Sequence, residues 1–335
     1  MNALVTGGTG FIGTALVSKL LEDGNNVIIL TRDERKVSSF LKGKVKVLEA
    51  DISDLTSLKR IDISAQNVNI IFHLAASLNY FGDRRRLFRA NVAGTRNLLN
   101  LAERDGIKRL IFTSSIEAMG MIGEDKIPAD ENLICKPVST YGESKLESEK
   151  QVIRFAKERG LDAIILRLAN VYGPGSPAFI VPIANAILKR GEFFKFLPVY
   201  KDRYLHPVYI NDVVEVIIKA IQRLNQIQTY IIAGEEYVTI GTLFELIAQI
   251  LNVDLQIKKK NMNDELYLNL RKKIHKFLKK ADLFTYFMAG EGQKIHRAYS
   301  IEKAKKELGY YPKVSLKEGV VKTIEWAEQK GLLKR

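Results

Sequence analysis

Three side chains in the middle of the chain have the types and spacing of a proton-transfer site. Ser115 follows a short apolar strand pattern, and Tyr141 and Lys145 stand four residues apart in a segment with helical periodicity. Residues four apart share one helix face, so the phenol and the ammonium can address one point. A phenol titrates at about pH 10 and needs a pKa lowered by about 2 to 3 to act as a base near neutrality. An ammonium about 4 Å away supplies on the order of 4 kcal/mol, so we expect Lys145 to lower the pKa of Tyr141.

The chemistry that fits these groups is hydride transfer to or from a carbonyl carbon. Ser115 can hold the substrate oxygen by a hydrogen bond, while Tyr141 exchanges a proton with it. Lys145 would also bind the nicotinamide ribose. Such a site requires a dinucleotide, and therefore a place in the fold that binds one.

A glycine-rich corner near the first residue predicts that place. An apolar run from Ala3 to Val5 leads through the corner into an amphipathic segment, residues 11–21, giving strand, loop and helix in that order. The first glycine permits the tight turn, the second lets the backbone approach a pyrophosphate, and the third lets helix and strand pack closely. The helix N-terminus then favours an anion. The residues expected to bind the cofactor here are Gly7, Thr9, Gly10, Phe11, Ile12 and Gly13.

The end of the second apolar strand pattern, residues 26–30, indicates which dinucleotide binds. A carboxylate at this tip would bind both ribose hydroxyls of NAD and repel the extra phosphate of NADP. This chain has Thr31 there, followed by Arg32, whose guanidinium can clamp a 2′-phosphate with two parallel hydrogen bonds. We therefore predict NADP, with NAD as the alternative if Arg32 is only a solvated loop charge.

Two further strand ends are expected to border the cofactor. Asp51 could accept a hydrogen bond from the adenine amino group, with Ile52 covering the ring, or Asp51 could simply cap a helix that starts near Leu55. The strand at residues 69–74 continues into small residues that let a cofactor cross the backbone, which assigns Leu74, Ala75 and Ala76 to the site. His73, inside that strand, is expected to be a hydrogen-bonded core residue.

The alternation of strand and helix patterns predicts an α/β fold, a Rossmann-type doubly wound parallel sheet with a second, smaller, interrupted α/β substrate domain. A Gly/Pro cluster at 173–175 marks the first boundary. A helix at 208–224 and a strand at 229–233 are expected to return to the nucleotide domain. We therefore assign 1–173 and 207–233 to the NAD(P)-binding domain, and 174–206 and 234–335 to the substrate domain.

The composition limits the functional classes. The 335 residues are 46% hydrophobic and 27% charged, which is typical of a soluble globular protein. The single cysteine, Cys135, excludes an internal disulfide and suits a reducing compartment. No apolar run approaches membrane-spanning length, so a cytoplasmic location is expected. We predict no metal site.

Half of the formal charge of +14 lies in one segment. Residues 257–281 contain nine Lys/Arg and two Asp/Glu, with apolar residues at helical spacing. Such a helix could pack on its own domain or form a lid, or it could contact an anionic membrane peripherally. A nucleic-acid partner is not expected, because no recognised binding module is present.

Taken together, these motifs resemble a known family, the extended short-chain dehydrogenases/reductases, also called the NAD-dependent epimerase/dehydratase family. The matching pieces are residues 6–13, 51–52, 73–76, Asn91, 114–115, 141–145, 170–174, 206–212 and 303–310, which together span almost the whole chain apart from about 255–296. The resemblance implies that Ser115, Tyr141 and Lys145 are the catalytic triad and that Asn91 helps organise the proton path. It also implies that Leu168, Asn170 and Val171 line the cofactor, and that a homodimer forms through the helices at 91–105 and 141–158.

Departures from the family pattern point to a branch and to substrate residues. The arginine that binds diphosphate in nucleotide-sugar members is replaced by Leu205 and His206, with Arg203 as a displaced substitute. Thr31-Arg32 and His206-Pro207 look more like the dihydroflavonol reductase and 3β-hydroxysteroid dehydrogenase branch. Glu117 lies where sugar-nucleotide 4,6-dehydratases place a catalytic glutamate. The candidate substrate residues are therefore Glu117, Arg203 and His206.

Three functions follow from these patterns. The first is an NADP(H)-dependent oxidoreductase acting on a secondary alcohol or ketone as its small-molecule substrate. The second is a nucleotide-sugar 4-epimerase or 4,6-dehydratase, which takes hydride and returns it, so the cofactor is not consumed. The third is a non-catalytic module that senses NADP(H), and the presence of all three triad residues argues against it.

Overall fold

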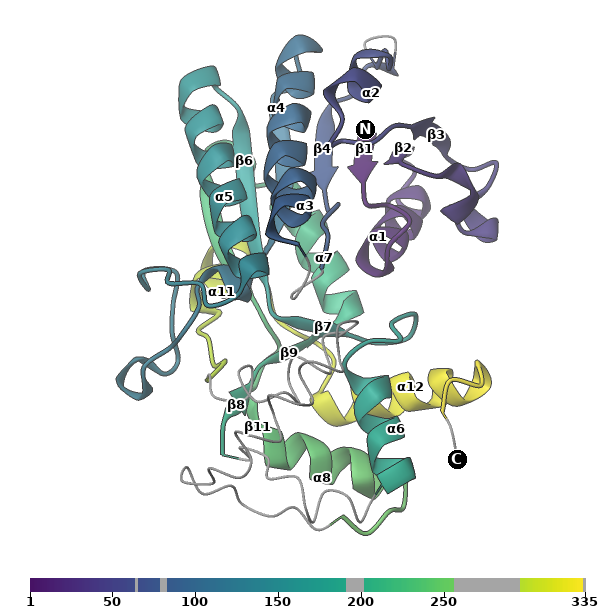
Figure 1. Cartoon of the computed structure of the whole chain (residues 1–335), viewed down its shortest axis with the longest axis vertical. Helices are drawn as coiled ribbons and strands as arrows, with labels where there is room; N and C mark the ends of the chain where they lie inside the picture. Colours follow the sequence, from purple (N-terminus) through teal and green to yellow (C-terminus); the bar gives the residue numbers. More distant parts are fainter. Residues whose placement is uncertain (64–65, 79–82, 191–201, 256–295, 334–335) are drawn as a thin grey trace.

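A parallel sheet of seven strands organises the chain (Figure 1). The computed structural model describes residues 1–63, 66–78, 83–190, 202–255 and 296–333. The strand order is β10-β6-β5-β4-β1-β2-β3, and every neighbouring pair is parallel. The strands are β1 (Asn2–Thr6), β2 (Asn26–Thr31), β3 (Lys46–Glu49), β4 (Ile70–His73), β5 (Arg109–Ser115), β6 (Asp162–Leu168) and β10 (Gln228–Ile232).

Helices cover both faces of this sheet. Ala3 and Val5 of β1 join the core shared with α1 (Phe11–Glu22) and α7 (Ile210–Ile221). Leu4 points to the opposite face, where it joins the core shared with α4 (Gly94–Arg104) and α5 (Thr140–Arg159). Side chains alternate across a strand, so a sheet that is buried on both faces requires strands that are apolar at almost every position. This requirement explains the continuous apolar runs of the sequence.

The strand order reverses at β1. From there the chain adds β2 and β3 on one side and β4, β5, β6 and β10 on the other. Connections that leave in opposite directions open a crevice at the carboxyl ends of the strands, where ligands of doubly wound folds bind. The predicted Rossmann-type sheet is confirmed, and its switch point lies between the glycine-rich loop after β1 and the segment after β4.

Most of the remaining elements lie beyond the carboxyl edge of the sheet in Figure 1, but the short helix α2 (Leu55–Lys59) lies toward the opposite edge. Helix α6 (Ile180–Arg190) packs against α8 (Ile240–Ile250) and α12 (Leu316–Gln329). The division into two domains stays a prediction, although β10 pairs with β6 at the sheet edge as the return of 207–233 requires. The remaining strands form two pairs, β7 (Asn170–Tyr172) with β9 (Pro207–Tyr209) and β8 (Tyr204–Leu205) with β11 (Val238–Thr239). The remaining helices are α6 (Ile180–Arg190), α8 (Ile240–Ile250), α11 (Glu302–Leu308), α12 (Leu316–Gln329) and the short helices α2 (Leu55–Lys59) and α3 (Arg84–Phe88).

One predicted helix begins later than expected, and one predicted segment is not described. The helix predicted from Val208 begins at Ile210, because Val208 pairs with Val171 in the small sheet of β7 and β9. The basic segment at 257–281 lies outside the described residues. Within the parts of the chain that are described, no helix has the length and apolarity needed to cross a membrane.

Candidate active site

The glycine-rich loop has the shape of a dinucleotide cradle. Gly7 has φ +74°, a value that side chains disfavour, and a Cβ there would lie 2.6 Å from the backbone nitrogen of Ala75. A Cβ on Gly13 would overlap the carbonyl oxygen of Gly7, so only glycine lets α1 start this close to the loop. At Gly10 a Cβ would meet only the carbonyl oxygen of Gly7, at 3.3 Å, and otherwise open space. The tight turn at Gly7 and the close packing at Gly13 are therefore as predicted, whereas the approach of a pyrophosphate at Gly10 stays a prediction.

The start of α1 favours an anion. Gly10 is the N-cap residue and offers no side chain to accept from the free N–H groups, and the first turn contains no acidic residue. Those N–H groups and the positive end of the helix dipole remain available to a ligand. The loop therefore fits a pyrophosphate.

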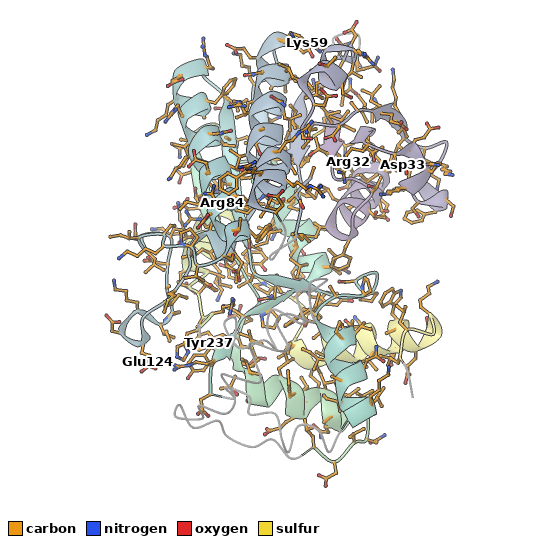
Figure 2. The ribbon with its side chains drawn as sticks, in the orientation of Figure 1. Arg32, Asp33, Lys59, Arg84, Glu124 and Tyr237 are labelled. Carbon is orange, nitrogen blue, oxygen red and sulfur yellow. The ribbon has the colours of Figure 1, made fainter. Side chains whose placement is uncertain are left out.

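At the tip of β2, Arg32 is the exposed side chain next to the buried Thr31 (Figure 2). The neighbouring carboxylate of Asp33 accepts from Arg35 Nε at 2.8 Å and from the Arg35 backbone N–H at 3.1 Å. That carboxylate is thus held by its own loop, and Arg32 has no ion-pair partner among the described residues. The first cation after β2 is therefore free to meet an anion.

The segment after β3 shows that the alternative role of Asp51 as a helix cap is wrong. Asp54, not Asp51, caps α2, because the Asp54 carboxylate accepts from the Thr56 N–H at 2.9 Å. Asp51 instead accepts from the Ser53 N–H at 2.8 Å. Ile52 packs close to Gly94 at the start of α4.

The segment after β4 lies directly against the glycine-rich loop. The Ala75 N–H donates to Thr6 Oγ1 at 3.3 Å, and the Leu74 N–H donates to the Thr6 carbonyl at 3.1 Å. His73 is fully buried between Thr6 and Thr95, with ring nitrogens 2.8 and 2.9 Å from their hydroxyls. Burial lowers the pKa of His73 to about 3. The prediction of a core histidine is confirmed.

The three proton-transfer candidates come together at the carboxyl edge of the sheet. Ser115 is the last residue of β5, while Tyr141 and Lys145 lie in the first two turns of α5, with 5% and 2% of their surfaces exposed. The helix starts there because Ser139 accepts from the Gly142 N–H at 3.0 Å as an N-cap. The Tyr141 hydroxyl hydrogen-bonds with Ser115. The structure therefore places a serine and a tyrosine hydroxyl together, with a buried lysine one turn away.

The electrostatics of this group differ from the expectation. Burial and the Glu117 carboxylate raise the pKa of Tyr141 well above its ordinary value, and only the hydrogen bond with Ser115 opposes them. Lys145 Nζ donates to the Thr113 carbonyl at 2.7 Å and lies 4.2 Å from the Phe112 ring centroid. Burial lowers the pKa of Lys145 to about 7. The predicted lowering of the Tyr141 pKa by Lys145 is therefore wrong for the protein's own groups, because burial and Glu117 raise this pKa and Lys145 is not among the groups that shift it.

Asn91 lies beside α5, and hydrogen bonds occupy both its side-chain oxygen and its side-chain nitrogen. It sits in a π-helical turn, Arg89–Ala93, a feature that often marks functional sites. Its side-chain oxygen accepts from the Ser77 N–H at 2.7 Å, and its amide donates to Ser144 Oγ at 2.9 Å and to the Ser77 carbonyl at 3.1 Å. Ser144 Oγ donates in turn to the Tyr141 carbonyl at 2.7 Å. Asn91 thus braces the backbone of Tyr141 through Ser144, a residue that the sequence analysis missed.

A second missed group lies under Lys145. Glu149, one turn later on α5, accepts from Arg167 Nη2 at 2.7 Å and from Ser114 Oγ at 2.5 Å. All three residues are buried. A single arginine inside the apolar strand β6 was the available signal, because a buried charge requires a partner. The carboxylate of Glu149 also favours the charged form of Lys145.

The three candidate substrate residues are held by other groups. Glu117 is buried and accepts from Arg297 at 2.9 Å. Arg203 donates at 2.8 Å to Glu124, an exposed residue labelled in Figure 2, and contacts His296. His206 is buried between the Gly234 carbonyl and the Tyr299 N–H. Burial lowers the pKa of His206 to about 4, so this ring is neutral at pH 7 and cannot serve as a cation for an anionic substrate.

The start of β7, two residues after the end of β6, contains a buried acceptor without a partner in the described part of the chain. Asn170 Oδ1 is buried and has no hydrogen-bond partner among the described residues. Leu168 is buried beside it, and Val171 is half-buried in β7. An unpaired buried acceptor indicates a missing donor, which agrees with the assignment of this strand end to the cofactor.

Sequence comparison assigns the family. The description "NAD dependent epimerase/dehydratase family" applies to a sequence profile that matches residues 3–234 of this chain. The chain belongs to the NAD-dependent epimerase/dehydratase family. The resemblance seen in the sequence motifs is therefore confirmed, and the protein is an enzyme of this family.

Relatives within the family differ in reaction. The chain is 30% identical to a putative UDP-glucose 4-epimerase of Methanocaldococcus jannaschii, covering 96% of this chain and 97% of that protein. It is also 30% identical to a putative dihydroflavonol 4-reductase of a Synechocystis species, covering 70% and 66%. Its fold matches the crystal structure of a Thermotoga maritima UDP-glucose 4-epimerase with UDP-glucose at a TM-score of 0.78, 29% identity and 98% and 99% coverage. Similar identity to an epimerase and to a reductase leaves the reaction to be argued from the site.

Proposed function

We propose that this enzyme is an NADP(H)-dependent oxidoreductase that transfers hydride between the cofactor and a secondary alcohol or ketone. The observation that carries the proposal is the hydrogen-bonded pair of Ser115 and Tyr141 at the end of β5, with Lys145 buried one turn away. A cradle for a pyrophosphate lies at the end of β1, at the same edge of the sheet. A proton-transfer pair and a cofactor cradle at one edge are the two parts that such a reaction needs.

In this proposal the protein positions the substrate oxygen and delivers a proton to it. The bound nicotinamide would supply or accept the hydride. The Ser115 hydroxyl would donate a hydrogen bond to the substrate oxygen, and the Tyr141 hydroxyl would deliver a proton to that oxygen. The raised pKa of Tyr141 keeps the phenol protonated near neutrality, which is the form that a carbonyl reduction requires. In the direction of ketone reduction the phenol can therefore act as the acid without first gaining a proton.

The state of Glu117 favours this reaction over the dehydratase alternative. A residue that removes a proton from a sugar ring must reach the substrate with its carboxylate. The Glu117 carboxylate is occupied by Arg297 and by Ser139 Oγ at 3.4 Å, and 8% of the residue is exposed. The alternative of a nucleotide-sugar 4-epimerase keeps support from the names of two relatives.

Arg32 is the reason to propose NADP over NAD. Two hydrogen bonds from an exposed guanidinium to a phosphate are charge-assisted and contribute roughly 1.5 to 3 kcal/mol. We expect Arg32→Ala to weaken NADPH binding about tenfold or more and to leave NADH binding unchanged, measured by fluorescence titration. Lys36→Ala, which removes an exposed cation from the same loop, is the matched control. Equal affinity of the wild-type protein for NADH and NADPH would contradict the assignment.

The reaction itself is tested by following cofactor and substrate together. Purified protein is incubated with NADPH and a panel of ketones, and separately with NADP⁺ and UDP-glucose. Stoichiometric loss of NADPH with a ketone, abolished in Tyr141→Phe while NADPH still binds, is the expected result. Interconversion of the sugar nucleotide without net cofactor consumption would establish the epimerase alternative.

Three further assignments belong to this proposal. The cytoplasm is the proposed location, because a single cysteine suits a reducing compartment. A homodimer through α4 and α5 is proposed from the family resemblance. The domain division proposed from the sequence places 174–206 and 234–335 around the substrate.

A further inference from the structure

Glu117 occupies a junction between the two catalytic hydroxyls and the C-terminal part of the chain. It lies in the short 3-10 turn Ile116–Ala118 that directly follows Ser115. Its backbone N–H donates to Ser115 Oγ at 3.2 Å, so the turn helps to fix the position of the serine hydroxyl. Its carboxylate accepts from Ser139 Oγ at 3.4 Å, and Ser139 is the N-cap of the helix that carries Tyr141.

The same turn is packed tightly against the first turn of α5. A Cβ on Gly142 would overlap the carbonyl oxygen of Glu117, so the helix backbone sits directly on this residue. Tyr141, the neighbour of Gly142, therefore has a position that depends on where Glu117 lies.

Arg297 supplies the counter-charge from a distant segment. Its Nη2 and Nε donate to Glu117 Oε1 at 2.9 and 3.2 Å, and the two side chains are 2% and 8% exposed. The segment around Arg297 is anchored on two other sides. The Arg297 N–H donates to the Tyr204 carbonyl in β8 at 2.9 Å, and the Ala129 N–H donates to the Ala298 carbonyl at 3.0 Å.

We propose that Glu117 and Arg297 are positioning residues for the catalytic pair, and that their ion pair couples the segment 296–300 to Ser115 and Tyr141. This inference rests on the proposed role of Tyr141. The pair fixes the turn after Ser115 against the N-cap of α5, and it holds a compensated negative charge close to the phenol. Burial and the Glu117 carboxylate both raise the pKa of Tyr141. Because the arginine comes from the segment bonded to β8, a displacement of that segment would alter the charge near the phenol.

The test measures the ionisation of Tyr141 directly and needs no substrate. The full chain is labelled with 3,5-difluorotyrosine, because ring fluorination makes phenols more acidic and brings their titration into a range where the protein is folded. The chain has 13 tyrosines, so the Tyr141 resonance is assigned in the ¹⁹F NMR spectrum by its loss in Tyr141→Phe. Its midpoint is then measured in wild type, Glu117→Gln, Arg297→Lys and a control.

The matched control is Glu143→Gln. Glu143 also lies in the first turn of α5 and pairs with an arginine, Arg84 (labelled in Figure 2), at 3.2 Å, but both members of this pair are exposed, with 44% of the Glu143 side chain and 64% of the Arg84 side chain accessible. Exposed pairs are screened by water and salt. We expect Glu117→Gln to lower the Tyr141 midpoint by about one pH unit, as removal of a buried like charge does. Glu143→Gln should move it by less than about a third of that, and Arg297→Lys, which keeps the charge, should leave it within a few tenths of wild type.

A midpoint in folded Glu117→Gln equal to that of wild type would overturn the proposal. If Glu117→Gln does not fold, Glu117→Gln/Arg297→Gln replaces the ion pair by two neutral amides and must still lower the midpoint. Addition of NADP⁺ to the same samples tests the proposed function separately from the proposed role of the ion pair. Failure of the cofactor to shift the Tyr141 resonance would count against the proposed function, whereas the variants report on the ion pair alone.

Discussion

Lys145 is expected to make the free energy of unfolding of this protein rise with pH between about pH 7 and pH 10.5. Its pKa falls from an ordinary 10.5 to about 7, because the ammonium is buried and only Glu149 favours its charged form. Glu149 is itself occupied by Arg167 and Ser114, so its support for the lysine is shared. A shift of this size corresponds to a differential free energy on the order of 5 kcal/mol between the two protonation states.

The sign follows from counting protons. Between about pH 7 and pH 10.5 the unfolded chain binds a proton on Lys145 that the folded chain does not bind. Stability rises with pH wherever the unfolded state binds more protons. The contribution of Lys145 to the free energy of unfolding should therefore increase by up to about 1.4 kcal/mol per pH unit across this window. Below pH 7 both states are protonated, and the folded state bears the full cost of a buried charge.

The assay compares wild type with Lys145→Met by urea denaturation from about pH 6.5 to about pH 9.5. Methionine has a similar length and no charge, so its own contribution does not change with pH. The difference in unfolding free energy, Lys145→Met minus wild type, should fall by about 3 kcal/mol over the series. Lost bonding to the Thr113 carbonyl shifts the whole curve but not its slope.

Lys150→Met is the control on the same helix. Lys150 is exposed, with 61% of its side chain accessible, and pairs with Glu147 at 3.5 Å. Its curve should run parallel to wild type. Parallel curves for Lys145→Met as well would mean that Lys145 keeps an ordinary pKa in the folded protein, and the electrostatic account of the site would fail.

Further predictions concern the cofactor loop and the buried charges. Gly13→Ala should lower the unfolding temperature by several degrees, because its Cβ overlaps the Gly7 carbonyl; an unchanged transition in a thermal melt would contradict the close packing. Gly10→Ala should melt close to wild type, since its Cβ faces mostly open space, yet bind NADPH at least about tenfold more weakly if the pyrophosphate lies there; a titration that matches wild type would exclude this position. Glu149→Gln should cost about 3 to 5 kcal/mol in urea denaturation, because it leaves Arg167 buried without its counter-charge, and a loss under about 1 kcal/mol would show that the pair is not desolvated.

Local patterns in the sequence predicted the sheet and the cradle well. The strands are continuous apolar runs and the glycines sit at a turn that only glycine can form, so each was readable from neighbours along the chain. Gly7 has the positive φ that its place in the motif requires, and the helix with Tyr141 and Lys145 begins within one residue of the expected start. Such features depend on residues that are close in sequence.

The electrostatics were not readable in the same way. The spacing of Tyr141 and Lys145 indicates a shared helix face, but not that the amine bonds to Thr113 across 32 positions of the chain. Arg297 is 180 residues from the carboxylate it binds. The residues around Glu117 in the sequence therefore give no sign of whether an arginine pairs with it. Burial and distant partners decide these pKa values, so a prediction based on spacing alone gave the wrong direction for Tyr141.

The site thus has two buried carboxylates with parallel arrangements. Glu149 lies one turn beyond Lys145 and is neutralised by Arg167 from β6, whereas Glu117 lies beside Tyr141 and is neutralised by Arg297 from beyond the sheet. In each case an arginine from another element pairs with a carboxylate that acts on the pKa of one residue of the candidate site, Lys145 or Tyr141. Arg167 belongs to the central sheet, so the environment of Lys145 is fixed by the core of the fold. Arg297 belongs to a segment attached to β8, so the acidity of Tyr141 is the property that a change near the substrate side could alter.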